Sequence, residues 1–151
     1  MSIQVQLTED LKNAMKSGDA ITKDTVRLIR SAVQNAEIEK QGDLDDTDVS
    51  LVLGKMAKQY RDSITVYREA KRDDLVAKEE TELAVVMRYL PEQMSADDVR
   101  TIAETVVAEV GATGPGDKGK VMGKLMPQVR GKADGSMVNT VVGELLDALV
   151  G

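Results

Sequence analysis

The sequence predicts an all-α protein, with an N-terminal helical bundle over residues 1–93 and a small C-terminal three-helix domain over residues 94–151. Along most of the chain the apolar residues recur every three or four positions, which is the period of one face of a helix. No stretch alternates with the period of two that a half-buried strand shows, and hairpin-turn signals are absent. Breakers divide the chain, because no proline precedes Pro91 and nine of the 12 glycines lie between Gly111 and Gly151.

Four helices are predicted in the first 93 residues, each with an apolar stripe and a start or stop signal. They cover approximately Ser2–Lys16, Thr22–Gly42, Val49–Lys71 and Asp73–Leu90. Thr22 is the expected N-cap of the second helix, since a threonine hydroxyl accepts a hydrogen bond from a free N–H of the first turn. Asp73 or Asp74 is expected to cap the fourth helix. Pro91 is expected to stop it, because proline lacks the N–H that a helix needs.

Three helices are predicted in the rest of the chain, over about Ser95–Val110, Asp117–Met126 and Ser136–Leu149. Ser95 opens the first of them in a pattern that resembles a capping box, with Asp98 in place of the usual Glu or Gln. Gly111 is a suitable residue just beyond its end. Pro127 is expected to bound the next helix.

The composition excludes several classes of function. The 151 residues include no Cys, His, Trp or Phe, and the aromatic side chains are three tyrosines. Disulfides, thiol nucleophiles, Cys-based zinc sites, imidazole bases and Ser-His-Asp triads are therefore excluded. Three tyrosines are too few for the base-stacking surface of an RRM or an OB-fold.

The charge and the start of the chain predict a location. The net charge of −6 argues against the whole surface binding nucleic acid. The first residues form neither a basic nor an apolar leader segment, and no window approaches 18 uninterrupted apolar residues. We therefore expect a soluble, cytoplasmic protein that does not enter a membrane.

Residues 114–121 imitate a nucleotide-binding motif. They have the glycine and lysine spacing of a P-loop, but Val121 stands where the motif requires Ser or Thr to hold Mg²⁺. The motif also requires a preceding strand, whereas residues 95–110 show a helical stripe. We interpret the segment as a glycine-rich turn that opens a helix.

The stretch from Lys118 to Lys132 is the strongest candidate for a functional site, because it is basic and free of acids in an acidic chain. Its three glycines would let a polyanion approach the backbone closely, and the N–H groups at a helix start suit phosphate. A solvated basic face beside a tight helix–helix crossing explains the same composition, and composition alone favours this second interpretation. The candidate nucleic-acid-binding residues are Lys118, Lys120, Lys124, Arg130 and Lys132, with Asn139 as a further polar contact.

Other charged clusters predict no site. The cations between Lys55 and Arg72 are interleaved with carboxylates, which favours i,i+4 ion pairs. The acidic stretch Asp43–Asp48 lacks the glycine and the terminal glutamate of an EF-hand loop. Adjacent carboxylates such as Glu79 and Glu80 have no partner for acid–base catalysis. No catalytic residue, metal site or cofactor is therefore predicted.

Short motifs along the whole chain resemble the stand-alone YqeY-like proteins. In order they are Gln59–Ile64, Arg72–Val76, Tyr89–Gln93, Gly119–Met122, Leu125–Pro127, Gly131–Gly135 and Val138–Asn139. Through residues 131–142 the last third is also similar to the tail domain of the B subunit of the tRNA-dependent Asp/Glu amidotransferase. Many such tail domains have Asn-Pro where this chain has Asp134-Gly135, so a different backbone geometry is expected at that turn.

The resemblance implies the two-part helical fold and leaves three functions open. In the amidotransferase the tail domain helps to hold tRNA and performs no chemistry, which implies a non-catalytic accessory protein that binds tRNA. A second hypothesis is a module that docks on a synthetase or an amidotransferase component. A third is a carbon–nitrogen ligase with glutamine as amido donor, which only the family label suggests and for which no catalytic residues are identifiable.

Overall fold

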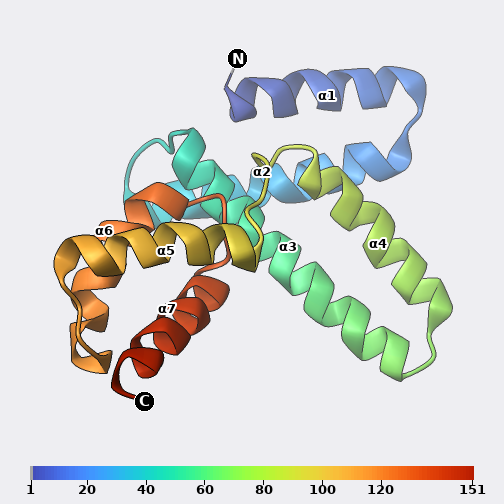
Figure 1. Cartoon of the computed structure of the whole chain (residues 1–151). Coiled ribbons are helices and arrows are strands. Elements are labelled where there is room, and N and C mark those ends of the chain that lie inside the picture. The colour runs from blue at the N-terminus through green and yellow to red at the C-terminus, as the bar shows by residue number, and fades with distance from the viewer. Residues whose placement is uncertain (1) are drawn as a thin grey trace. The chain divides into compact units, whose positions relative to one another are not determined.

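The computed structural model describes residues 2–151 and contains, over that range, seven α-helices and one short 3₁₀ helix (Figure 1). The all-α prediction is thereby confirmed. The chain forms two compact units, Met1–Leu90 and Pro91–Gly151, while the finer prediction of a bundle and a three-helix domain stays a prediction. The first unit contains α1 (Ile3–Ser17), α2 (Ala20–Lys40), α3 (Asp46–Glu69) and α4 (Asp73–Met87). The second contains α5 (Ala96–Val110), η1 (Pro115–Asp117), α6 (Lys118–Val129) and α7 (Gly135–Val150).

The core of the first unit consists of aliphatic side chains that the helical period brings to one face of each helix. The most deeply buried, each at most 2% exposed, are Leu7, Val26, Ile29, Val49, Leu53, Ala57, Val85 and Val86. Tyr89 is the aromatic member of this core. With no Phe or Trp in the sequence, branched aliphatic residues fill the space between the helices.

A tight turn joins α1 to α2. Gly18 has a φ of +77°, a left-handed conformation that glycine adopts without steric cost. The carboxylate of Asp19 accepts a hydrogen bond of 3.1 Å from the backbone N–H of Thr22, and this bond lowers the pKa of Asp19. The prediction that Thr22 is the N-cap is wrong: the ionised carboxylate is the stronger acceptor, and Thr22 is buried within the first turn.

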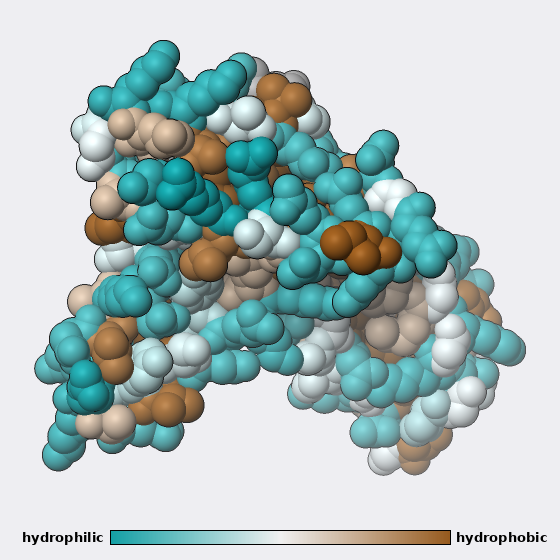
Figure 2. All heavy atoms as spheres, turned by 180° about the vertical axis from the view of Figure 1, so that it is seen from behind, coloured by the Kyte–Doolittle hydropathy of each residue, from teal (hydrophilic) through white to brown (hydrophobic). Residues whose placement is uncertain are grey.

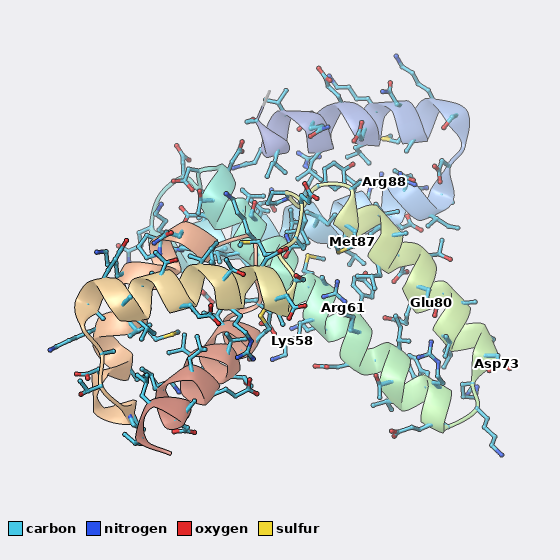
Figure 3. All side chains as sticks on the ribbon, viewed as in Figure 1. Lys58, Arg61, Asp73, Glu80, Met87 and Arg88 are labelled. Carbon is cyan, nitrogen blue, oxygen red and sulfur yellow. The ribbon has the colours of Figure 1, made fainter. Side chains whose placement is uncertain are left out.

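The helices α3 and α4 form an antiparallel pair joined by a turn at Lys71, whose φ is +56° (Figure 1). Between the two helices, the Arg61 guanidinium donates a hydrogen bond of 3.5 Å to Met87 Sδ. Both residues are labelled in Figure 3. Arg68 forms an ion pair of 3.1 Å with Glu80. This pair joins neighbouring helices, whereas the sequence analysis expects pairs within one helix.

The ends of α4 differ from the prediction. Asp73 is the first helical residue, and Arg72 takes the N-cap position without a side-chain capping bond. Asp74 lies 3.2 Å from the Arg72 guanidinium instead of capping the helix. The helix ends at Met87, earlier than Leu90. There the N–H groups of Arg88 and Tyr89 bond to the carbonyls three residues before them, which tightens the chain into a 3₁₀-type turn.

In the second unit α5 begins with the predicted capping box. The Ser95 hydroxyl accepts a bond from the Asp98 N–H, and the Asp98 carboxylate accepts one from the Ser95 N–H, both of 3.1 Å. Gly111 ends the helix with a φ of +66°, as predicted. The core residues of this unit at most 1% exposed are Val99, Ala103, Val106, Val121, Leu125, Val129, Val138, Val142 and Leu146.

Pro127 lies inside α6, so the prediction that it bounds the helix is wrong. A proline removes the hydrogen bond to the carbonyl four residues earlier, and here that carbonyl belongs to Gly123. Both residues are exposed. The freed carbonyl therefore belongs to a residue on the solvent-exposed side of the helix, where a lost backbone hydrogen bond costs less than it does in a core.

Candidate nucleic-acid interface

Helix α6 carries three of the predicted basic residues, and its period sorts them onto different sides. The side that begins at Val121 and recurs every four residues is fully buried in the core. Six residues of α6 are exposed on the solvent side: Gly119, Lys120, Gly123, Lys124, Pro127 and Gln128. The first four of them are termed here the α6 face. The α6 face therefore combines two glycines one turn apart with two lysines one turn apart, and it contains no acid.

The segment before α6 does not have P-loop geometry. Gly114 is buried, and a Cβ placed on it would lie 2.8 Å from Cγ1 of Val150, so close helix packing explains this glycine. The Asp117 carboxylate accepts bonds from the Thr113 N–H at 2.9 Å and the Thr113 hydroxyl at 3.2 Å, and the backbone bond above all lowers the pKa of Asp117. The segment is a turn that opens a helix. Its carboxylate puts a negative charge at the start of α6, which repels a phosphate there.

Each lysine of the α6 face has one carboxylate partner. Lys120 Nζ lies 3.8 Å from Asp117, and Lys124 Nζ lies 2.8 Å from Glu109 of α5. The two lysine side chains are 72% and 52% exposed, so water surrounds both pairs. Because exposed pairs of this kind contribute only about 0–1 kcal/mol, a phosphate can replace either carboxylate at little cost.

Lys118 is separated from the α6 face. It is half-buried, and its Nζ lies 3.8 Å from the position that a Cβ on Gly143 would occupy. Gly143 follows Asn139 by one turn of α7. The Lys118 ammonium and the exposed Asn139 amide therefore lie on the same side of α7.

Arg130 and Lys132 follow α6, in the turn that leads to α7. Gly131 between them has a φ of +78°. The Lys132 carbonyl accepts a bond of 2.7 Å from the Met94 N–H, and the Gly131 carbonyl accepts one of 3.3 Å from the Gln93 amide. These bonds fix the turn, and both cationic side chains project into solvent.

The six predicted residues thus form three groups: the lysines of the α6 face, Lys118 with Asn139, and the two cations of the turn. Sequence reasoning missed Glu109, since a partner on another helix leaves no local signal. It also missed Gly143, although an isolated glycine within a helical stripe is a signal of close approach by another group.

Residues 2–151 hold neither a cluster of metal-binding side chains nor a helix that could span a membrane. No group of three or more His, Cys, Asp or Glu side chains is placed there to hold a metal ion. In the acidic stretch Asp43–Asp48, Asp45 caps α3, and Asp48 in the first turn of that helix pairs with Lys40 at 2.8 Å. Over the same range, every helix is too short or too polar to cross a lipid bilayer.

A family model described as "Yqey-like protein" matches residues 4–146. The chain belongs to the YqeY-like family. The match extends from α1 into α7, and it confirms the family that the sequence motifs indicate.

Three similar proteins carry the name "Altered inheritance of mitochondria protein 41, mitochondrial". The one from Pyrenophora tritici-repentis is 30% identical over 95% of this chain and 80% of its own length. The one from Candida glabrata is 34% identical over 72% of this chain and 62% of its own length. The one from Lachancea thermotolerans is 39% identical over 56% of this chain and 46% of its own length. The chain therefore spans less than two thirds of the last two relatives.

The names of these relatives correct one expectation. The sequence analysis predicts a cytoplasmic protein, whereas the relatives are named as mitochondrial, so that prediction is wrong. Composition could not decide the point, because an acidic chain without cysteine suits more than one reducing compartment.

Proposed function

We propose that this protein is a non-catalytic accessory protein of the tRNA machinery, which contacts tRNA phosphates through the α6 face. Lys118, Arg130, Lys132 and Asn139 supply further contacts. The observation that carries the proposal is the α6 face itself, where two exposed lysines stand beside two exposed glycines and no acid is present.

The two glycines of the α6 face leave room for a polyanion to approach the helix. No heavy atom beyond the local helical backbone lies within 4 Å of the Cβ position of Gly119 or Gly123, so a polyanion can come into contact with the helix surface. The lysines beside them neutralise phosphates and release bound counterions, which is the main source of such affinity. Phosphate contacts do not read sequence, so weak, salt-sensitive and largely sequence-independent binding is expected.

The distribution of apolar side chains on the surface favours a polar binding partner. In the view of Figure 2, apolar side chains are scattered among hydrophilic ones instead of gathering in one large patch. Contiguous apolar patches mark protein–protein interfaces, whereas scattered apolar residues are normal on a soluble surface. This favours an electrostatic partner over an apolar docking surface on the face shown.

The side chains also support a binding role over a ligase. In the described residues, the buried polar side chains are Thr22, Thr25 and Ser50, none of which ionises near neutral pH. With no His or Cys in the sequence, the usual bases and nucleophiles of amide chemistry are missing.

Titration of fluorescently labelled tRNA at low and moderate salt tests the proposal. The logarithm of the association constant is expected to fall linearly with the logarithm of salt concentration. The double variant Lys120→Gln with Lys124→Gln should make that slope shallower by about 1.4 to 1.8, because each lost phosphate contact removes about 0.7 to 0.9.

A matched control is the double variant Lys71→Gln with Lys78→Gln. It makes the same change in charge at two exposed lysines of the first unit. It should leave the slope unchanged, with folding of all variants checked by circular dichroism. Absence of tRNA binding at low salt, or equal losses in the two double variants, would contradict the proposed function.

A further inference from the structure

The hairpin of α1 and α2 carries a second concentration of positive charge, which the sequence analysis does not single out. Over residues 3–40 the six cations balance six acids, but residues 11–30 contain five cations and only two acids. These five residues, termed here the hairpin face, are Lys12, Lys16, Lys23, Arg27 and Arg30. The charge of the hairpin is thus segregated.

The geometry of the hairpin brings these cations to one side. On α2 they stand at i, i+4 and i+7, and on α1 they are one turn apart, so each set shares a helix face. Arg30 and Thr8 both line a shallow hollow of about 130 Å³ between the two helices. Lys12 lies one turn beyond Thr8 on α1, so the helical period puts it on the flank of α1 that borders this hollow.

The two acids of the same stretch, Asp19 and Asp24, lie at other places in the first unit. The Asp19 carboxylate caps α2 by accepting the Thr22 N–H. Asp24 lines a different hollow of about 390 Å³ together with Ala77 and Thr81 of α4. Neither carboxylate forms an ion pair with a cation of the hairpin face.

The carboxylates at the border of the hairpin face leave it positive. Asp10 accepts a hydrogen bond of 2.6 Å from the Tyr89 hydroxyl. Glu9 is exposed and lies three residues before Lys12, on the side of α1 that carries Lys12 and Lys16, and Glu37 lines the same hollow as Arg30. The five cations still outnumber these two carboxylates. None of the five cations forms an ion pair with a carboxylate of residues 2–151, in contrast to both lysines of the α6 face.

We propose that the hairpin face is a second phosphate-binding surface, which contacts the backbone of RNA. Five cations without carboxylate partners, spread over two helices, match an extended polyanion better than a single small anion. The inference rests on the proposed function, because that function supplies the RNA. It adds a surface in the first unit that shares no residue with the α6 face.

The apolar side chains nearby favour RNA over an anionic membrane. Membrane-surface binding combines cations with large apolar side chains that enter the bilayer. Met15, 56% exposed, is such a side chain beside the lysines of α1. Ile21 and Leu28 are also about half exposed, but they share the other flank of α2, where Ile21 lines the hollow next to α4.

The test uses the full chain with one substitution in each helix, Lys12→Gln and Arg27→Gln. In the tRNA titration, this double variant should make the salt slope shallower by about 1.4 to 1.8. The variant Lys71→Gln with Lys78→Gln is again the control and should keep the slope of the unaltered chain. Circular dichroism establishes that each variant is folded.

A footprint gives a second readout that needs no substitution. Lysines are acetylated with and without tRNA and analysed by mass spectrometry; Lys12, Lys16 and Lys23 should be protected by tRNA, and Lys71 and Lys78 should not. An unchanged slope together with no protection would overturn the inference. Binding to vesicles of anionic phospholipid, with no protection by tRNA, would also overturn it and assign the hairpin face to membranes.

The two proposals fail separately. If the Lys120→Gln and Lys124→Gln variant binds tRNA normally while the Lys12→Gln and Arg27→Gln variant does not, the α6 face is wrong and the hairpin face stands. If only the Lys120→Gln and Lys124→Gln variant loses tRNA binding, the hairpin face alone is overturned. If both variants lose tRNA binding, both surfaces are supported.

Discussion

Two of the three tyrosines have hydroxyl groups whose pKa the fold raises. Burial raises the pKa of Tyr60 to about 12, and the nearby carboxylates of Glu82 and Glu79 add to the effect. Burial also raises the pKa of Tyr89, and its hydrogen bond of 2.6 Å to Asp10 acts in the same direction. The Tyr89 hydroxyl bonds to Asp10 of α1, and Tyr60 of α3 lies near two carboxylates of α4, so the titration of both groups reports on the stability of the first unit.

The raised pKa of Tyr60 predicts a loss of stability in alkaline solution. The unfolded chain releases this proton near the ordinary pKa of 10.0, whereas the folded protein keeps it until about pH 12. The contribution is therefore fully present below pH 10 and is lost as pH rises towards 12, since the unfolded state then binds fewer protons. Urea unfolding across this range should show a smaller decline in Tyr60→Phe. An identical decline in both proteins would refute the assignment.

Removing the Tyr89 hydroxyl should destabilise the protein at neutral pH. Hydrogen bonds to charged groups contribute about 1.5–3 kcal/mol, so Tyr89→Phe should lower the free energy of unfolding by about that amount. Urea unfolding measures the change. Tyr67→Phe is the control, because the half-buried Tyr67 hydroxyl makes no hydrogen bond within residues 2–151, and its effect should stay within about 0.5 kcal/mol. Equal losses would mean that the bond to Asp10 contributes nothing specific.

At the scale of the helix, Gly123 in α6 should affect stability and RNA binding in opposite directions. A Cβ there meets nothing within 4 Å beyond the local backbone, so Gly123→Ala should raise the free energy of unfolding by about 0.5–1 kcal/mol. The added methyl group should weaken tRNA binding if a phosphate approaches the helix at this residue.

Gly54 in α3 provides the matched comparison. It is also a helical glycine with nothing within 4 Å of its Cβ position. Gly54→Ala should give a similar gain in stability and leave tRNA binding unchanged. If both variants bind tRNA like the unaltered chain, Gly123 has no role in the interface. Thermal unfolding and the tRNA titration supply the two measurements.

Most helices were predictable, because each has a complete apolar stripe and because Ser95 and Gly111 are strong local signals. The errors have local physical causes. Asp19 takes the cap expected of Thr22, since an ionised carboxylate is a stronger acceptor. Pro127 continues α6, because the carbonyl that it frees is on an exposed glycine. A local sequence pattern does not show which of two neighbouring side chains will cap a helix, or whether a carbonyl freed by a proline will face solvent.

The candidate surfaces were less predictable than the helices. The acid-free stretch around α6 stands out in the sequence, yet the helical period divides its cations among separate sides, and Lys118 lies against α7. The hairpin face has no contiguous signal, since Lys12 and Arg27 belong to different helices. Only the turn at Gly18 and the i,i+4 spacing on both sides of it indicate that these cations meet.

At the scale of the whole molecule, each unit has its own core and the tyrosines report on one of them. The core of the first unit includes Leu53 and Tyr89, and that of the second includes Leu125. All three tyrosines lie before residue 90. Near-ultraviolet signals therefore follow the first unit, whereas far-ultraviolet circular dichroism follows the helices of both.

This separation predicts how a core cavity in the second unit will appear in unfolding experiments. Leu125 is fully buried, and Leu125→Ala should cost about 2–5 kcal/mol. If the cores unfold separately, far-ultraviolet circular dichroism should gain an early phase while the midpoint of the tyrosine signal stays where it is. Leu53→Ala, equally buried in the first unit, should instead shift the tyrosine midpoint. A joint shift of both signals in Leu125→Ala would show that the two cores unfold as one cooperative structure.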